Sequence, residues 1–281
     1  MTKFISTPSR TKEILEKYGI HAKKGFGQNF LVDPIIVERC AKEAHCEGAV
    51  IEIGPGIGSL TEQLAIYSKK VVAYEIDESL PPILEDTLSA YDNVEIILQD
   101  FLKADVKEKV NELKQQYGQV TVCANLPYYI TSPVLFKIFD IGDDIPYITV
   151  MMQKEVGDRF VAKPNDSEYG ALSVEGQYLY DVKKLFTVPG RSFNPSPKVD
   201  SVIIQFSRKK EVDLNIDLND FFEFVRACFK QRRKTIYNNL KEYLKDAEKT
   251  KHALEVSGVD VGVRAQELDV DTLKRLYEAT L

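Results

Sequence analysis

The sequence contains few of the residues that build metal or redox sites. Its three histidines, His21, His45 and His252, are scattered without metal-ligand spacing, so we expect no metal site. The four cysteines form no Cys-x-x-Cys pair and lie mostly in apolar contexts. This pattern predicts reduced thiols in the core of a cytosolic protein.

Long apolar runs are also absent. No stretch of eighteen apolar residues occurs, so we expect no membrane span. The first six residues, Met-Thr-Lys-Phe-Ile-Ser, include no apolar core followed by a small-residue cleavage site, and no secretory signal is expected. We therefore predict a cytoplasmic protein, acting as a monomer.

The length and the charge pattern suggest two domains and a nucleic-acid partner. A chain of 281 residues can hold one large domain and one small one. A charged stretch without helix periodicity at 207–217 predicts a linker, and we place the domains at 1–208 and 209–281. The net charge of −6 argues against nucleic-acid binding, but two segments, 3–24 and 226–245, are basic. Their basic residues include Lys23, Lys24, Arg232, Arg233 and Lys234.

A glycine-rich loop lies between a predicted strand and a predicted helix. Residues 50–53 form an apolar run typical of a buried strand, and a helix is expected over 59–67. Between them, 54–58 read Gly-Pro-Gly-Ile-Gly. Glycines let the backbone approach a ligand, and a helix N-terminus offers free N–H groups. The spacing differs from the dinucleotide-binding pattern, so the loop predicts a nucleotide-like ligand without defining it.

Ligand-type residues follow the next strands. Glu75 ends the strand that begins at residue 70, about twenty residues after the glycine loop, where a carboxylate binds ribose hydroxyls. Asp100 and Phe101 follow the strand at 94–98, and we expect Asp100 to accept from an adenine amine beside the Phe101 ring. Each acid alone would be explained as a loop carboxylate that caps a helix. A dehydrogenase would use Gly54 and Glu75 but would leave Asp100 without a role.

The segment Asn125, Leu126, Pro127 and Tyr128 follows the apolar strand at 120–124. The exocyclic amine of adenine or cytosine is a poor nucleophile because its lone pair is delocalised into the ring. The Asn125 side-chain carbonyl and the Leu126 backbone carbonyl could both accept from that amine and aim the lone pair, while Tyr128 stacks on the base. The alternative is an ordinary strand-to-turn junction.

The last part of the large domain is predicted to close the sheet. Residues 183–188 and 201–206 have the pattern of an antiparallel strand pair. Two prolines stiffen the loop between them, which has Phe193 and Lys198 near its ends. The loop can be a rigid turn, or Phe193 can sandwich a base. The strand and helix order predicts a three-layer α/β domain, with Gly54 at the carboxyl end of a central parallel strand, followed by a helical C-terminal domain.

Over nearly the whole chain, the sequence resembles the KsgA (RsmA) family, bacterial dimethyltransferases of two adjacent adenosines near the 3′ end of 16S ribosomal RNA. The matching motifs are Gly-Gln-Asn-Phe-Leu at 27–31, Glu-Ile-Gly-Pro-Gly-Ile-Gly at 52–58, Asn-Leu-Pro-Tyr at 125–128, Gln-Lys-Glu-Val at 153–156, Phe-x-Pro-x-Pro-Lys-Val-Asp-Ser at 193–201 and Gln-Arg-Arg-Lys-Thr at 231–235. The resemblance implies a Rossmann-like, seven-stranded S-adenosylmethionine-dependent methyltransferase domain with a small all-α C-terminal domain.

The resemblance also implies a cofactor site. S-adenosyl-L-methionine would be held by Gln28, Asn29, Leu31, Glu52, Gly54, Gly56, Glu75, Ile76, Asp100, Phe101 and Asn125. From the residues themselves we predict catalytic roles for Asn125, Leu126, Pro127, Tyr128 and Phe193, and RNA contact for Lys23, Lys24, Lys198, Arg232, Arg233 and Lys234.

The implied reaction is methyl transfer to adenine N6 in the small ribosomal subunit or its precursor. One alternative is the sister group, the Erm resistance enzymes, which methylate 23S RNA on the same fold. Erm enzymes usually carry Ile where this chain has Leu126, and they match poorly over residues 232–235. The other alternative is a non-catalytic RNA-binding assembly factor, which would leave Glu75, Asp100 and Asn125 without a role.

Overall fold

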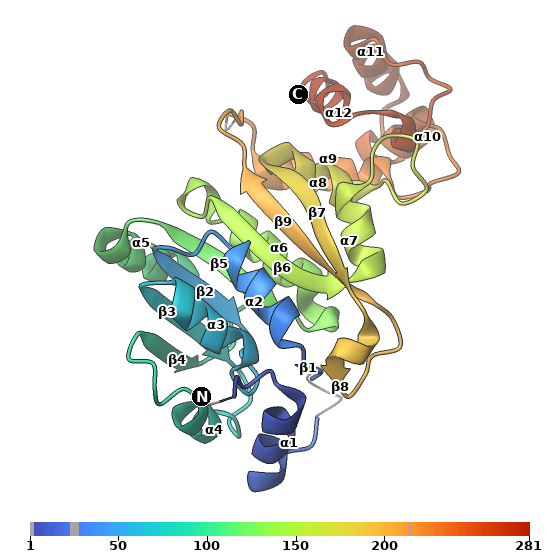
Figure 1. Ribbon diagram of the computed structural model, residues 1–281. Coiled ribbons are helices and arrows are strands. Elements are labelled where there is room, and N and C mark those ends of the chain that lie inside the picture. The colour runs from blue at the N-terminus through green and yellow to red at the C-terminus, as the bar shows by residue number, and fades with distance from the viewer. Residues whose placement is uncertain (1–2, 23–27, 214) are drawn as a thin grey trace. The chain divides into compact units, whose positions relative to one another are not determined.

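A computed structural model describes residues 3–22, 28–213 and 215–281 (Figure 1). Its centre is a seven-stranded sheet in the order β4-β3-β2-β5-β6-β9-β7. The strands are β2 (Ala49–Ile53), β3 (Lys70–Glu75), β4 (Val94–Leu98), β5 (Val120–Asn125), β6 (Tyr147–Gln153), β7 (Tyr180–Val188) and β9 (Ser201–Arg208). Strands β2 to β6 are parallel, and β9 runs antiparallel to β6.

The strand order reverses between β2 and β5. From β2 the chain adds β3 and β4 on one side, and it then returns to place β5 and β6 on the other. In such sheets, ligands bind outside the carboxyl ends of the strands at this switch point. Gly54 follows β2 directly, so the predicted position at the end of a central parallel strand is confirmed.

Helices cover both faces of the sheet, which makes the predicted three layers (Figure 1). On β9, Ile203 packs in the cluster that holds Val37 of α2 and Leu64 of α3. Phe206 lies three residues further along the strand and therefore points to the opposite face. There its ring meets Phe139 of α6, with ring centroids 5.5 Å apart. The predicted α/β fold class is therefore confirmed.

The helices of this part of the chain begin at recognisable signals. They are α1 (Pro8–Lys17), α2 (Pro34–Lys42), α3 (Ser59–Tyr67), α4 (Pro81–Thr87), α5 (Val106–Tyr117), α6 (Thr131–Phe139) and α7 (Lys154–Val161), with short 3-10 turns η2 (Tyr128–Ile130), η3 (Gly142–Asp144) and η4 (Gly190–Ser192). The Asp33 carboxylate accepts from the backbone N–H of Ile36 and so caps α2, as expected for an Asp-Pro pair. All four cysteines are free and buried, as predicted.

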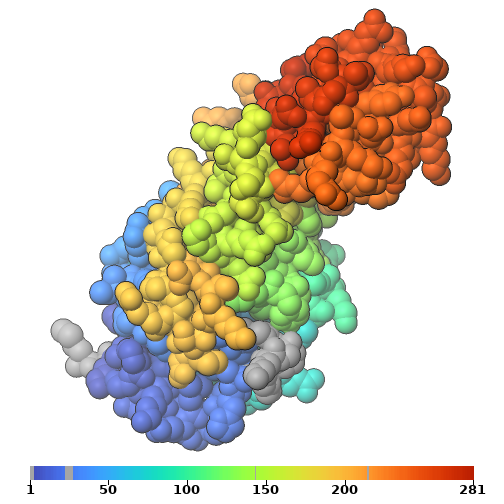
Figure 2. Space-filling view, turned by 90° about the vertical axis from the view of Figure 1, so that its right-hand side faces the viewer, coloured from blue at the N-terminus to red at the C-terminus, as the bar shows by residue number. Residues whose placement is uncertain are grey.

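A second, two-stranded sheet was not predicted. Strand β1 (Phe30–Leu31) pairs antiparallel with β8 (Phe193–Asn194), with Leu31 opposite Phe193. The last two residues of the Gly-Gln-Asn-Phe-Leu motif are therefore strand. Figure 2 shows the yellow-orange β8 region against the blue N-terminal part of the chain. The candidate RNA contacts Lys23 and Lys24 lie outside the described residues.

The chain divides into two compact units. Unit 1 contains residues 1–157 and 183–208, and unit 2 contains 158–182 and 209–281. Unit 1 ends at residue 208. Residues 158–182, however, group with the C-terminal helices, because Tyr178 of α8 (Ala171–Leu179) stacks near Phe221, with ring centroids 4.9 Å apart. The Arg226 guanidinium also pairs with the buried Glu175 carboxylate at 2.7 Å.

Unit 2 is helical, as predicted for the C-terminal part. Besides α8 it contains α9 (Leu218–Cys228), α10 (Ile236–Leu244), α11 (Ala247–Ser257), η5 (Ala265–Glu267) and α12 (Val270–Glu278). Its core is aromatic: the Phe221 and Phe224 rings of α9 each lie 5.4 Å from the Tyr277 ring of α12. Across the described residues, no helix is long and apolar enough to cross a membrane.

Candidate active site

A pocket of about 220 Å³ opens in unit 1 at the switch point between β2 and β5. Its walls come from the segments that follow β2, β3, β4 and β5, together with β1 and β8. The lining includes all the predicted cofactor and catalytic residues, namely Gln28, Asn29, Leu31, Glu52, Gly54, Gly56, Glu75, Ile76, Asp100, Phe101, Asn125, Leu126, Pro127, Tyr128 and Phe193. Residues separated by more than 160 positions in the sequence therefore meet at one place.

The glycine loop forms the floor of the pocket. Gly54 and Gly56 have φ angles of +71° and +60°, a region that L side chains rarely adopt. A Cβ at Gly56 would lie 3.5 Å from the ring of Phe30 in β1. The loop thus presents bare backbone to the pocket, which suits a ligand that approaches the main chain.

The end of β3 presents a carboxylate held by its own loop. Glu75 is 5 % exposed, and its Oε1 accepts from the backbone N–H groups of Ile76 and Asp77, each at 2.8 Å. Burial raises the pKa of Glu75, while these backbone hydrogen bonds and one from Gly56 oppose the rise. Asp77, which we did not single out from the sequence, is also buried and accepts from Gln28 Nε2 at 2.9 Å. The N-terminal segment is thereby connected to this carboxylate loop.

The end of β4 supplies a second carboxylate and a ring. Asp100 Oδ1 accepts from the backbone N–H of Leu102 at 2.9 Å, which fixes the turn after the strand. The Phe101 ring is buried and meets Tyr74 edge to face at 5.4 Å. The Lys137 ammonium of α6 donates to the carbonyls of Leu102 and Ala104, at 2.8 and 2.7 Å, and so holds the same loop from outside. Lys137 was also missed, because its role depends on a contact between distant segments.

Glu52 lies under the glycine loop and is 1 % exposed. Burial raises its pKa to about 8, against a smaller lowering by the Thr61 hydroxyl, so the carboxyl is mostly protonated at neutral pH. Its Oε2 has no hydrogen-bond partner among the described residues. A buried, unsatisfied oxygen beside a pocket is available to a ligand group. No cluster of three or more His, Cys, Asp or Glu side chains suited to a metal ion occurs in 3–22, 28–213 and 215–281.

The end of β5 differs from the other strand ends because its acceptors are unoccupied. The Asn125 side chain, which lines the pocket, makes no hydrogen bond within the described part of the chain. The Leu126 N–H donates to the Met151 carbonyl at 3.1 Å, and this bond holds the segment against β6. No described donor reaches the Leu126 carbonyl. Two carbonyl oxygens are therefore free to accept from a ligand amine.

Three aromatic side chains that line the pocket with these carbonyls differ in burial and in contacts. Tyr128 is half-buried, and its hydroxyl lies 2.7 Å from Ser201 Oγ of β9. Phe193 is 4 % exposed, packs in the core through β8 and also lines the pocket. Tyr129 also lines the pocket but is 57 % exposed. No role was predicted from the sequence for Tyr129, which adjoins the motif at 125–128, or for Ser201, which ends the motif at 193–201.

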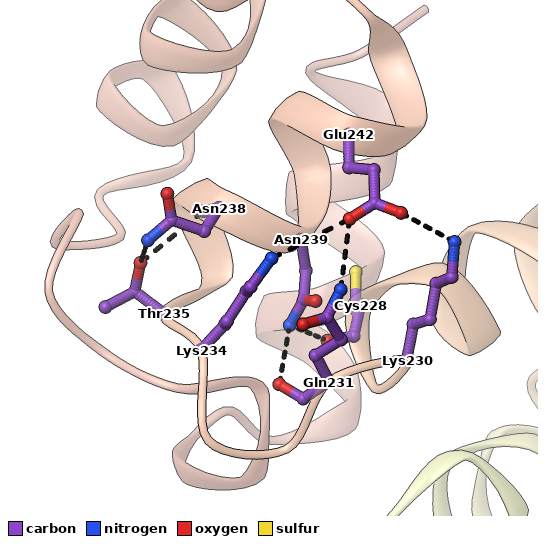
Figure 3. A network of polar contacts seen from close by, with 8 residues as sticks. All are labelled: Cys228, Lys230, Gln231, Lys234, Thr235, Asn238, Asn239 and Glu242. Carbon is purple, nitrogen blue, oxygen red and sulfur yellow. Dashed lines mark hydrogen bonds and ion pairs between the residues drawn. The ribbon is translucent and has the colours of Figure 1, made fainter.

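The remaining predicted RNA contacts do not line this pocket. Lys198 is exposed on the loop between β8 and β9 in unit 1. Arg232, Arg233 and Lys234 are exposed in unit 2, in the loop between α9 and α10. The Glu242 carboxylate holds this loop through Lys230 at 2.7 Å (Figure 3).

Polar contacts make the loop between α9 and α10 a defined structure. Asn239 Nδ2 donates to the carbonyls of Cys228 and Gln231, at 2.9 and 3.2 Å, and Thr235 caps α10 (Figure 3). Arg232 donates to the Ser167 carbonyl at 2.6 Å. Among the described residues, Arg233 has no ion-pair partner. The loop thus exposes cations on a fixed backbone.

Comparison with known proteins agrees with this architecture. The family model described as ribosomal RNA adenine dimethylase matches residues 19–280. The chain is similar to two proteins named "Ribosomal RNA small subunit methyltransferase A". That of Bacillus cereus is 49% identical, with 99% of this chain and 97% of the relative covered. That of Staphylococcus epidermidis is 45% identical, with 98% and 96% covered.

Solved structures give the same picture. A dimethyladenosine transferase from Plasmodium falciparum has a TM-score of 0.71 at 26% identity, covering 88% of this chain and 95% of its own. The 23S rRNA methyltransferase ErmE has a TM-score of 0.66 at 28% identity, covering 89% and 99%. The match over nearly the whole chain, together with the strand-end pocket, confirms the resemblance predicted from the sequence: this chain belongs to the ribosomal RNA adenine dimethylase family.

Proposed function

We propose that this protein transfers methyl groups from S-adenosyl-L-methionine to the N6 amines of two adjacent adenosines near the 3′ end of 16S ribosomal RNA. It would act in the cytoplasm, on the small ribosomal subunit or its precursor, during ribosome biogenesis. The observation that carries the proposal is the pair of unoccupied acceptors at Asn125 and Leu126, in the same pocket as the glycine loop and the strand-end carboxylates. An amine donor is the ligand that such acceptors need.

The residues of the pocket fit S-adenosylmethionine. The bare backbone at Gly54 and Gly56 leaves room for its methionine part, since a Cβ at Gly56 would already meet Phe30. Glu75 would accept from the ribose hydroxyls, held in place by the backbone N–H groups that its Oε1 accepts. Asp100 and Phe101 would bind the adenine amine and ring, and Ile76, 47 % exposed in the pocket, offers an apolar contact.

Asn125 and Leu126 would orient the target. When bound, the cofactor supplies an electrophilic methyl group. The two carbonyls would accept hydrogen bonds from the N–H groups of the target amine. These hydrogen bonds would localise the lone pair of the amine and point it at the methyl group. The base must leave its stack to reach them, and Tyr128 provides a ring on which it can stack. We infer that Pro127 fixes the direction of the Leu126 carbonyl, because the backbone of a residue that precedes proline is restricted.

Phosphate contacts would come from basic residues outside the pocket. We propose Lys198 in unit 1 and Arg232, Arg233 and Lys234 in unit 2, with Lys23 and Lys24 in addition. Such contacts bind the RNA backbone and set orientation without reading sequence. Residues 1–208 would then supply the chemistry and 209–281 would contribute RNA contact.

Two other functions are less well supported. An Erm-type 23S methyltransferase shares the fold, as the likeness to ErmE indicates. However, the curated relatives with 45–49% identity over nearly full length are named for the small subunit. A non-catalytic RNA-binding factor would not need free carbonyl acceptors in a pocket beside a glycine loop.

To test the proposal, the purified protein is incubated with S-adenosylmethionine and undermethylated small subunits, and in a separate reaction with S-adenosylmethionine and large-subunit RNA. Mass mapping of the RNA should locate dimethylated adenosines near the 3′ end of 16S RNA. Modification of 23S RNA alone would support the Erm-type activity. Cofactor binding below detection with no product on either RNA would support the non-catalytic factor.

A further inference from the structure

The Tyr128 hydroxyl is held by a residue far away in the sequence. Its oxygen lies 2.7 Å from Ser201 Oγ, although the two residues are 73 positions apart. Tyr128 follows β5 and Ser201 begins β9, and β6 lies between these strands. The bond therefore spans the carboxyl end of β6 and joins the target segment to the closing part of the sheet.

Ser201 is well fixed for this purpose. It is fully buried and stands opposite Gln153, the last residue of β6. The preceding residue is held twice: the Asp200 carbonyl accepts from the Lys154 N–H at 3.0 Å, and its carboxylate accepts from the Gly190 N–H at 3.0 Å. A hydroxyl on such a backbone is a rigid anchor for a side chain that would otherwise rotate about two torsions.

The neighbouring tyrosine shows what the bond changes. Tyr129 is 57 % exposed, and its side chain has no hydrogen bond or ring contact within the described residues. Tyr128 is half-buried and anchored. Consecutive aromatic residues at the same pocket thus differ in burial and in contacts, and the anchored one follows the free carbonyls of Asn125 and Leu126 in the chain.

We propose that Ser201 is a positioning residue, which orients the Tyr128 ring to receive the extruded target base. The proposal rests on the proposed function, and it assigns a role to the end of the stiff loop that Phe193 begins. A ring that is already oriented saves the entropy of fixing it when the base arrives. Ser201 itself touches neither the base nor the cofactor.

A double-mutant cycle tests the proposal. The variants are Tyr128→Phe, Ser201→Ala and both together, assayed with undermethylated small subunits for kcat and KM and by calorimetry for cofactor affinity. Each single variant should lose roughly three- to tenfold in kcat/KM, as expected for one hydrogen bond. The double variant should lose no more than either single one, because both remove the same bond. Cofactor affinity should be unchanged.

The matched control is Tyr67→Phe. Tyr67 is a partly buried tyrosine in the same unit, and neither it nor its partner Glu38 lines the pocket. Its hydroxyl donates to Glu38 Oε1 at a distance of 3.1 Å. Tyr67→Phe should change the melting temperature but not kcat/KM. If Ser201→Ala does not fold, the same bond is tested by Tyr128→Phe and by Ser201→Cys. The cysteine side chain has nearly the volume of serine. Losses that multiply in the double variant, or a normal kcat/KM in a folded Ser201→Ala protein, would overturn the proposal.

A second readout does not depend on activity. NMR relaxation of ring-labelled tyrosines, with Tyr128 assigned by its absence in Tyr128→Phe, reports the motion of the ring. Ser201→Ala should increase this motion, and an unchanged ring would again overturn the proposal. The two proposals can fail separately. If the wild-type protein were inactive on small subunits while the Tyr128 ring still moved more in Ser201→Ala, the proposed substrate would be wrong and the anchoring of Tyr128 by Ser201 would stand.

Discussion

The two sides of the pocket are built differently. On the side of β3 and β4, the acceptors already have partners: Glu75 accepts two backbone N–H groups and Asp100 accepts one. On the side of β5, the Asn125 amide and the Leu126 carbonyl have none within the described residues. The first side is held rigid by its own loops, while the second is left unsatisfied until a ligand arrives.

This difference indicates how the protein would bind the cofactor and the target amine. A cofactor is bound in every cycle, and pre-formed loops bind it with little reorganisation. A target amine should be bound most strongly in the transition state, and unsatisfied acceptors are suited to that. Removal of a group on the first side should therefore weaken affinity, and removal on the second side should slow turnover.

The largest effect is expected from Asn125→Ala. It removes the carbonyl that orients the target amine, and the rate should fall on the order of 10²–10³-fold, as for removal of one transition-state hydrogen bond. RNA affinity should fall much less. Single-turnover methylation of undermethylated small subunits measures the first quantity, and filter binding measures the second.

Melting curves provide the check on Asn125→Ala. If the side chain only fixed the turn after β5, the melting temperature would fall and the folded protein would keep its rate.

On the cofactor side, Asp100→Ala should weaken S-adenosylmethionine binding. A hydrogen bond to a charged acceptor contributes about 1.5–3 kcal/mol, which corresponds to about a 10- to 150-fold rise in Kd. Asp100→Asn is the matched control, because its amide oxygen can still accept from the Leu102 N–H and keep the turn. Calorimetry should rank Asp100→Ala as the weaker binder, and equal affinities to wild type in both variants would remove the assignment.

The third expected effect concerns RNA binding outside the pocket. Neutralising Arg232, Arg233 and Lys234 together should weaken binding to small subunits and flatten its salt dependence. The slope should change by roughly 0.7–0.9 for each phosphate that the variant no longer neutralises. Cofactor affinity should stay as in wild type.

A control for this triple variant changes the same charge elsewhere in unit 2. Lys249, Lys251 and Arg275 are also exposed, and their neutralisation should leave the salt slope closer to that of wild type. Equal slopes in the two triple variants would mean that the loop between α9 and α10 has no special role in binding RNA.

The last effect is on stability and not on activity, and it follows from Glu52. Its pKa is raised to about 8 in the folded protein, while an unfolded glutamate titrates near 4.3. The folded state therefore binds the proton more tightly, and this group lowers stability as pH rises from about 4.3 to about 8. Glu52→Gln cannot ionise, so its melting temperature should fall less than that of wild type between pH 5 and pH 8. Parallel curves for the two proteins would contradict the buried, protonated carboxyl.

The strand ends were predictable from the sequence because each part of the signal is local. An apolar strand, a glycine loop and a helix start are contiguous around Gly54, and the acid at Glu75 follows at a fixed interval. Parallel strands bring their carboxyl ends to one edge, so the meeting of Glu75, Asp100 and Asn125 follows from topology. Helices α4 and α5 were not predicted, although Pro81 and the capping Asp105 are ordinary start signals.

Contacts between distant segments were not predictable. The pairing of β1 with β8, the Tyr128–Ser201 bond and the hold of Lys137 on the loop after β4 each join segments with no shared local pattern. For the same reason, the burial of the Phe193 ring through β8 was not predictable. Residues 158–182 precede the last strands, yet α8 packs with α9 through aromatic rings that only the tertiary structure brings together.

The most direct test of the division between the two sides is the single-turnover rate of Asp100→Ala and Asn125→Ala as the S-adenosylmethionine concentration is raised to saturation. The rate of Asp100→Ala should recover to near the wild-type value, because that substitution weakens cofactor affinity alone. The rate of Asn125→Ala should stay on the order of 10²–10³-fold low at every concentration. Recovery of Asn125→Ala at high cofactor, or a persistent deficit in Asp100→Ala, would contradict the account.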